Sequence, residues 1–82
     1  MIDNRMIDTY VLIECDLGRT ELIASNLQEI NGVREVDMIN GVYDIIVKIS
    51  VESKKDLDEA YSKIRLVDGI KTTVTLVAYT KD

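Results

Sequence analysis

The chain has no histidine, proline, tryptophan or phenylalanine, and one cysteine among its 82 residues. Histidine is the commonest general base and the commonest metal ligand, so its absence argues against a zinc or copper site and against most acid–base catalysis. A lone cysteine cannot form an internal disulfide. With no histidine to deprotonate it, Cys15 is expected to be a small core residue rather than a nucleophile. We therefore expect no metal, no cofactor and no enzymatic activity.

Positive charge is also scarce. Ten Lys and Arg against fifteen Asp and Glu give a net charge of −5, which has the wrong sign for direct binding to nucleic acid. Apolar runs such as 11–13 and 45–47 fall far short of the roughly 18 residues of a membrane span. The first six residues lack the apolar stretch and cleavage site of a signal peptide. We expect a cytoplasmic protein that contacts neither nucleic acid nor a membrane.

The residues that are present indicate a folded α+β domain. Hydrophobic residues make up 46% and charged residues 30% of the chain, a composition too apolar for a disordered segment. Nine Val and eleven Ile against seven Leu favour a pleated sheet covered by helices. Eighty-two residues suffice for one core, so we expect a single domain over residues 1–82, with its ordered part at about 7–79.

Local signals divide the chain into six expected elements. Alternating apolar positions and turn residues predict strands at 6–15, 33–40, 42–51 and 70–79, and a helix at 19–30. Ser53 followed by Asp56 resembles a capping box and predicts the start of a second helix, which Asp68-Gly69 ends. Asn40-Gly41 predicts a tight type I′ hairpin between the second and third strands.

An internal repeat connects these elements. Residues 27–34 align with residues 64–71 at an offset of 69 − 32 = 37, which indicates two βαβ halves. Right-handed crossovers then give an antiparallel sheet of order 4-1-3-2 with both helices on one face, the ferredoxin-like fold.

The face of the sheet opposite the helices is expected to be unusually apolar. The residues expected there are Tyr10, Leu12, Val42, Ile46, Val74 and Leu76, alongside Asp8, Asp44 and Lys48. An apolar patch of this kind marks an interface, and a two-fold, sheet-to-sheet homodimer is the simplest way to bury it. We expect Tyr10, Leu12, Ile46, Val74 and Leu76 to form the dimer interface. The alternative interpretation is that one of these strands is assigned one residue out of register, which would exchange the side chains on its two faces.

Three short segments stand at the expected ends of helices and strands: Ile-Asn-Gly-Val at 30–33, Asn-Gly-Val-Tyr-Asp at 40–44, and Asp-Gly-Ile-Lys-Thr-Thr-Val-Thr at 68–75. Together they resemble the C-terminal effector-binding and oligomerisation domain, or RAM domain, of the Lrp/AsnC transcriptional regulators. The resemblance implies a sheet-to-sheet dimer (a dimeric α+β barrel) that assembles further, for example to octamers, and binds small molecules, usually amino acids, between dimers. Family regulators also carry an N-terminal helix-turn-helix domain. About six residues precede the first expected strand here, so we expect a stand-alone effector domain.

The resemblance also suggests a ligand site made of Gly41, Val42, Tyr43, Asp44, Thr73 and Thr75. Asp44 would accept hydrogen bonds from a ligand ammonium, and the two threonines, two apart on one strand, would present hydroxyls on one face. Gly41 would let a ligand approach the backbone, and Tyr43 would supply an aromatic wall. Each residue also has a structural interpretation: Gly41 in the turn, Tyr43 in the core, and Asp44 in a hydrogen bond to the turn or across the dimer.

Three functions remain open on these grounds. The first is a ligand-sensing, self-assembling domain in transcriptional or metabolic regulation. The second is a pure interaction module that pairs with a full-length Lrp/AsnC regulator through the same face. The third is a small enzyme of the dimeric α+β barrel type, which the lack of histidine and of any nucleophile–base pair argues against.

Overall fold

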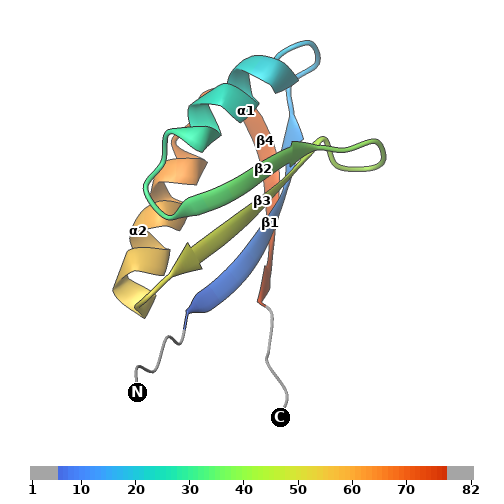
Figure 1. The fold of residues 1–82 in the computed structure, drawn as a ribbon. Helices are drawn as coiled ribbons and strands as arrows, with labels where there is room; N and C mark the ends of the chain where they lie inside the picture. The colour runs from blue at the N-terminus through green and yellow to red at the C-terminus, as the bar shows by residue number, and fades with distance from the viewer. Residues whose placement is uncertain (1–5, 78–82) are drawn as a thin grey trace.

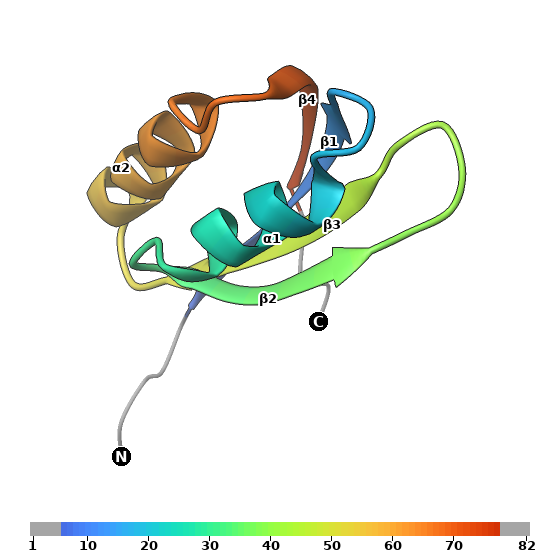
Figure 2. The same ribbon diagram turned by 90° about the horizontal axis from the view of Figure 1, so that it is seen from above.

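Four antiparallel strands and two helices make up the protein in the computed structural model, which describes residues 6–77 (Figure 1). The elements are β1 (Ile7–Cys15), α1 (Thr20–Gln28), β2 (Val33–Met38), β3 (Ile45–Val51), α2 (Lys54–Arg65) and β4 (Ile70–Val77). The strand order is β2-β3-β1-β4, and both helices cover the same face of the sheet (Figure 2). This order is the predicted one read from the opposite edge, so the ferredoxin-like α+β fold is confirmed.

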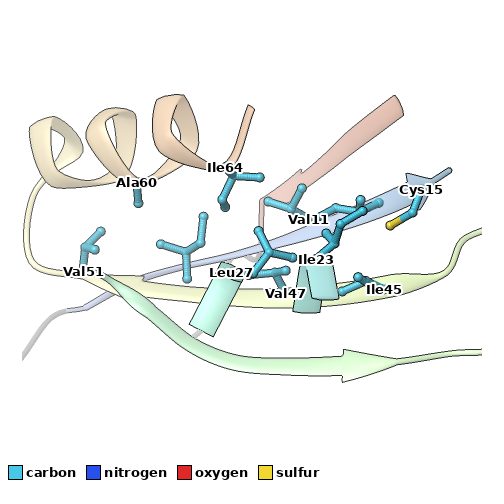
Figure 3. Close-up of a cluster of buried hydrophobic side chains, with 11 residues drawn as sticks. Val11, Cys15, Ile23, Leu27, Ile45, Val47, Val51, Ala60 and Ile64 are labelled. Atoms are coloured by element: carbon cyan, nitrogen blue, oxygen red, sulfur yellow. The ribbon is translucent and has the colours of Figure 1, made fainter. Parts of the chain in front are cut away.

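The core lies between the helices and the covered face of the sheet (Figure 3). Along β1 and β3 every second side chain is buried, as the alternating pattern predicts for a sheet with one covered face. The buried apolar side chains are Val11, Ile13 and Cys15 from β1, Ile45, Val47, Ile49 and Val51 from β3, Ile23 and Leu27 from α1, and Ala60 and Ile64 from α2. Cys15 is thus a core residue, as expected.

The second helix begins where the capping pattern places it. Ser53 has extended backbone angles, and its Oγ accepts a hydrogen bond from the backbone N–H of Asp56 at 3.1 Å. This bond satisfies one of the N–H groups that lack a partner in the first turn of a helix.

The sequence repeat has a structural counterpart in two glycines. Gly32 and Gly69 both adopt positive φ, at 97° and 98°. A Cβ on Gly32 would lie 3.0 Å from Cγ1 of Val51 on β3, and a Cβ on Gly69 would lie 2.8 Å from Cδ1 of Ile23 on α1. The glycine of each half therefore leaves room for a core side chain of the other half.

The connection between β2 and β3 differs from the prediction. Instead of a two-residue type I′ turn at Asn40-Gly41, residues 39–44 form a longer loop, which the Ile39 N–H closes by donating to the Asp44 carbonyl at 2.9 Å. A type I′ turn needs positive φ at both central residues, and among the described residues only glycines have positive φ. Asn40 therefore does not support that turn, and the predicted strands 33–40 and 42–51 each lose residues to the loop.

The predicted outer bounds of two other elements also shift. The first helix is shorter than 19–30 mainly at its C-terminus, where the N–H groups of Glu29 and Ile30 donate to carbonyls three residues back and end the α-helix in a tighter turn. Residues 78 and 79 of the predicted last strand lie outside the described residues.

Candidate functional site

The face of the sheet without helices has an apolar centre. In the strand register Leu12 of β1 lies opposite Ile46 of β3 and Val74 of β4. Tyr10 lies opposite Lys48 and Leu76 in the next row. These side chains alternate with the buried residues of the core and therefore point away from the helices.

All five residues predicted for the interface share this face, and the alternative of a slipped strand does not apply to them. Leu76 is 47% exposed, and the other four are half-buried in the single chain. Val42 is the exception among the residues expected on this face, because it lies in the loop of residues 39–44 and is 82% exposed.

Charged side chains border the apolar centre along β1. At one end Asp8 accepts a hydrogen bond from the Ser50 hydroxyl at 2.6 Å. At the other end Glu14 lies 3.8 Å from the Lys71 ammonium. Tyr10 and Leu12 lie between these two acids on the same strand, so the patch is apolar in the middle and polar at its ends, the arrangement typical of interfaces.

Asp44 holds the hairpin loop to the end of β1. Its Oδ2 accepts a hydrogen bond from the Cys15 N–H at 2.8 Å, and its own N–H donates to the Ile13 carbonyl at 2.8 Å. The last residue pair between β1 and β3 is Ile13–Ile45, so the carboxylate supplies the partner that a longer β3 would have supplied to Cys15. Asp44 therefore has a structural hydrogen bond, but its partner is the end of β1 and not the turn or a second copy, as the structural interpretation had it.

The surroundings of Cys15 shift the pKa of its thiol. Burial raises its pKa above the usual value, and the negative charges of Asp44, Asp16 and Glu14 raise it further. The thiolate is therefore disfavoured, as expected for a core cysteine and not for a nucleophile.

The two candidate threonines face the helices. Thr73 pairs with Ile13 and Thr75 with Val11, whose side chains are buried on the covered face. The hydroxyls of Thr73 and Tyr61, the latter on α2, share a hydrogen bond of 3.1 Å. The threonines therefore share a face, as predicted, and it is the face opposite the apolar centre.

Tyr61 is a member of this cluster that the sequence analysis did not identify as a site residue. The hydrogen bond with Thr73 lowers the pKa of its phenol most, and the nearby Thr75 hydroxyl and the Arg65 charge lower it further, against the opposing effect of burial. The Arg65 guanidinium lies 5.7 Å from the centre of the Tyr61 ring, within cation–π range. Helical spacing indicates which side of α2 faces the sheet, but it contains no signal for the hydroxyl pair.

The structure does not bring the six candidate ligand residues together in one chain. Asp44 precedes β3 and Thr73 lies on β4, with β1 between these strands. Two strand spacings separate them, about 10 Å. Gly41 and Val42 are exposed and Tyr43 is half-buried in the loop. A Cβ on Gly41 would meet nothing within 4 Å, so crowding does not require glycine there.

A hollow of about 220 Å³ lies elsewhere, at the end of β3 distant from Asp44. Gly32, Val51 and Ala60 are among the residues that line it. Over residues 6–77 no group of three or more His, Cys, Asp or Glu side chains could hold a metal ion. The same residues include no helix long and apolar enough to cross a membrane.

A family model described as the Lrp/AsnC ligand binding domain matches residues 8–81. The chain belongs to the Lrp/AsnC family. Two of the three Lrp/AsnC-like segments meet at one end of the sheet: Asp44 binds Cys15, and the next residue, Asp16, donates its N–H to the Gly69 carbonyl at 2.8 Å. The third segment contains Gly32, which is packed against α2.

Curated relatives contain this Lrp/AsnC domain as part of longer chains. Homocitrate synthase from Saccharolobus islandicus is 33% identical over 76 residues, which are 92% of this chain and 16% of the synthase. The chain thus spans about one sixth of the length of the curated relatives it matches.

Solved structures with a similar fold include chains that the match covers almost completely. The structure named FFRP-DM1 is 30% identical with a TM-score of 0.82, and the match covers 89% of this chain and 99% of that one. TTHA0845 from Thermus thermophilus is 26% identical with a TM-score of 0.84, over 93% of this chain and 96% of that one.

Proposed function

We propose that the chain is a regulatory effector domain of the cytoplasm that forms homodimers through its helix-free face and binds an amino acid or a related small molecule where protomers meet. Its role would be in transcriptional or metabolic regulation through changes in assembly. The observation that carries the proposal is the apolar centre formed by Ile46, Leu12 and Val74 in one row and Tyr10 and Leu76 in the next, where Lys48 completes the row. Membership of the Lrp/AsnC ligand-binding family supports it.

The apolar centre favours a partner of the same kind. A two-fold axis through the face would set Leu12 and Tyr10 of β1 against the same strand of a second copy, with Asp8 and Glu14 towards the wet rim. Each square ångström of apolar surface removed from water contributes about 25 cal/mol. Residues of the two copies make the whole of this contact, so it requires no other protein and no ligand.

A ligand site between dimers accounts for the distance between the candidate residues. Thr73 and Thr75 point away from the helix-free face, so in this arrangement the loop of residues 39–44 of one dimer lies beside the β4 strand of another dimer, outside the sheet-to-sheet contact. A free amino acid carries an ammonium and a carboxylate a few ångströms apart, and it needs acceptors beside donors. Asp44 supplies the acceptor. Its carboxylate has two oxygens, so the group that binds Cys15 can accept from an ammonium as well.

The proposal is tested by measuring the mass of the assembly and its affinity for amino acids. Native mass spectrometry of the purified protein should show even multiples of the 9.3 kDa chain, with any co-purified ligand retained. Isothermal titration calorimetry against the common amino acids should then identify at least one that binds. Thr73→Val, which keeps the shape and removes the hydroxyl, should weaken that binding about tenfold, the effect of one hydrogen bond.

Thr72→Val is the matched control, because Thr72 is the neighbouring threonine and points to the opposite face. It should bind the ligand as the wild type does. A monomeric protein, or a protein that binds none of the amino acids, would contradict the proposal.

A second candidate function is that of an interaction module. It is favoured by the observation that the domain makes up 16% of a longer relative, the homocitrate synthase. A free copy of the domain would then pair through the same face with the matching domain of a longer protein. Co-expression with a longer Lrp/AsnC-domain protein from the same genome would give hetero-oligomers in this case, and calorimetry would detect no small ligand.

A further inference from the structure

The tetrapeptide Ile-Asn-Gly-Val occurs twice in the chain, at residues 30–33 and at residues 39–42. Asn31 and Asn40 are therefore each followed by a glycine, and both asparagines are exposed. In an Asn-Gly dipeptide the backbone nitrogen of the glycine can attack the side-chain amide, because glycine has no side chain to hinder the approach. The attack requires rotation about the asparagine backbone. Since the neighbouring residues are identical, the surrounding structure decides which of the two asparagines can react.

The fold holds the first of these dipeptides, Asn31-Gly32, on both sides. The Val33 N–H donates to the Ile30 carbonyl at 3.1 Å across the dipeptide, and the Gly32 carbonyl accepts from the Ser50 N–H at 3.0 Å. Gly32 has a φ of 97°, and an added Cβ would lie 3.0 Å from a side chain of β3. Rotation about the Asn31 backbone would break both hydrogen bonds and displace Gly32 from its packed position. The reaction at Asn31 must therefore wait for a larger unfolding event.

The second dipeptide, Asn40-Gly41, lies in a loop without such support. Figure 2 shows this loop, between β2 and β3, extending beyond the end of the sheet. Among the described residues, none of 40–43 takes part in a hydrogen bond. The bond from the Ile39 N–H to the Asp44 carbonyl, at 2.9 Å, closes the loop at its base only. A Cβ on Gly41 would meet nothing within 4 Å, so rotation about the Asn40 backbone breaks no bond and displaces no packed atom.

We propose that Asn40 is a site of spontaneous deamidation and that the fold protects Asn31 from the same reaction. The backbone nitrogen of Gly41 loses its proton to a base in the solvent and bonds to Cγ of Asn40. The Cγ–Nδ2 bond breaks, and Nδ2 takes up protons from water and leaves as ammonia. Water then opens the cyclic imide at Cγ, which gives aspartate, or at the main-chain carbonyl carbon, which gives isoaspartate. Overall one water is consumed and one ammonia is released, so the reaction needs no oxidant, reductant or metal.

The product carries a new negative charge in the loop that ends at Asp44. The net charge of the chain changes from −5 to 10 − 16 = −6, and isoaspartate also lengthens the backbone of the loop by one carbon. In the proposed function this loop contacts the effector, so a second carboxylate there would repel the carboxylate of an amino acid. This consequence rests on the proposed function, whereas the deamidation itself does not.

Peptide mapping of aged protein tests the proposal. The purified protein is kept at mildly alkaline pH and sampled over time. Mass spectrometry then locates the mass gain that accompanies exchange of an amide for a carboxylate, and electron-transfer fragmentation distinguishes isoaspartate from aspartate. In the folded protein, deamidation at Asn40 should be at least about tenfold faster than at Asn31, because opening at Asn31 costs unfolding free energy. In concentrated guanidinium chloride the fold is lost, and the two asparagines should react at the same rate.

Asn40→Gln is the matched control, because the longer side chain would have to close a less favourable six-membered ring. This variant should lose the modification at position 40 and leave the rate at Asn31 unchanged. In the folded wild type, a ratio of the two rates below about tenfold would overturn the proposal. A rate at Asn40 in the folded protein more than about tenfold below its rate in denaturant would also overturn it, because the loop would then be shown to protect the dipeptide.

A calorimetric comparison separates the modification from the proposed function. Asn40→Asp carries the charge of the product without ageing, and Asn40→Gln has a similar polar side chain without the charge. The affinity of Asn40→Asp for an amino acid that binds the wild type should be about threefold or more below that of Asn40→Gln. Equal affinities would contradict an effect of the modification on ligand binding. A wild type that binds no amino acid would contradict the proposed function, whereas the peptide map alone decides whether Asn40 deamidates.

Discussion

The apolar centre of the helix-free face predicts a large effect of one polar substitution. Leu12 lies in the middle of the row Ile46–Leu12–Val74 and is half-buried in the single chain. Complete burial of a leucine contributes about 1.5–3 kcal/mol, so covering the remaining half contributes about 1 kcal/mol in each copy. Leu12→Asn removes this contribution twice per dimer.

The asparagine adds a cost of its own. A buried amide without a hydrogen-bond partner costs about 1–3 kcal/mol, and the two-fold axis again doubles the cost. The sum is about 4 kcal/mol or more, so the dissociation constant of the dimer should rise about a thousandfold. Sedimentation equilibrium from nanomolar to high micromolar concentration covers this range.

Leu22→Asn is the control, since Leu22 is 57% exposed on α1, on the opposite side of the sheet. It should dissociate as the wild type does. Circular dichroism should show both variants folded, because neither leucine belongs to the buried core. A Leu12→Asn dimer within threefold of the wild-type affinity would refute the argument that this face is an interface.

Three further predictions concern the fold and the candidate site. Gly69→Ala should lower the free energy of unfolding by about 2–4 kcal/mol in urea titrations, because the new Cβ clashes with Ile23 and the alanine is strained at a positive φ. Gly18→Ala is the control, since it has a φ of 80° and open space around it, and it should lower the free energy of unfolding by about 1–2 kcal/mol. Asp44→Ala should cost about 1–3 kcal/mol because the Cys15 N–H loses its partner, while Asp44→Asn keeps an acceptor and should cost less; equal losses would show that this bond contributes nothing. Because the pKa of the Tyr61 phenol is lowered, an absorbance titration should contain a component that ionises below the usual phenol range, and Tyr61→Phe should remove it.

Features decided by neighbouring residues were accessible from the sequence. The Ser53 cap depends on a residue three positions away, and the strand faces depend on alternation within one segment. The glycine that follows the helix of each half, Gly32 or Gly69, marks the repeat. Because these signals agree, the strand order and the covered face of the sheet could be predicted.

The loop between β2 and β3 could not be predicted because a distant residue decides it. The Asn40-Gly41 pair is a strong local signal for a two-residue turn, but Asp44 binds Cys15, which is 29 positions away in the sequence. That bond places the start of β3 at Ile45 and assigns Val42 to the loop. A local pattern contains no information about such a contact.

The orientation of the threonines was undetermined for a similar reason. Spacing shows that Thr73 and Thr75 share a face, but it does not show which face. The register of β4 against β1 settles this, because Thr73 pairs with Ile13, whose side chain is buried. The partner hydroxyl of Tyr61 comes from an element 12 positions earlier in the chain, and no motif connects the two.

The strand order has a consequence for how the chain reaches its native state. β1 is flanked by β3 and β4, which both come from the second half of the sequence, while β2 contacts β3 and not β1. Neither half can therefore complete a sheet before the other has been synthesised. Folding must wait for contacts between distant segments, so we expect it to be slow for so small a protein and cooperative, without a stable half-folded species.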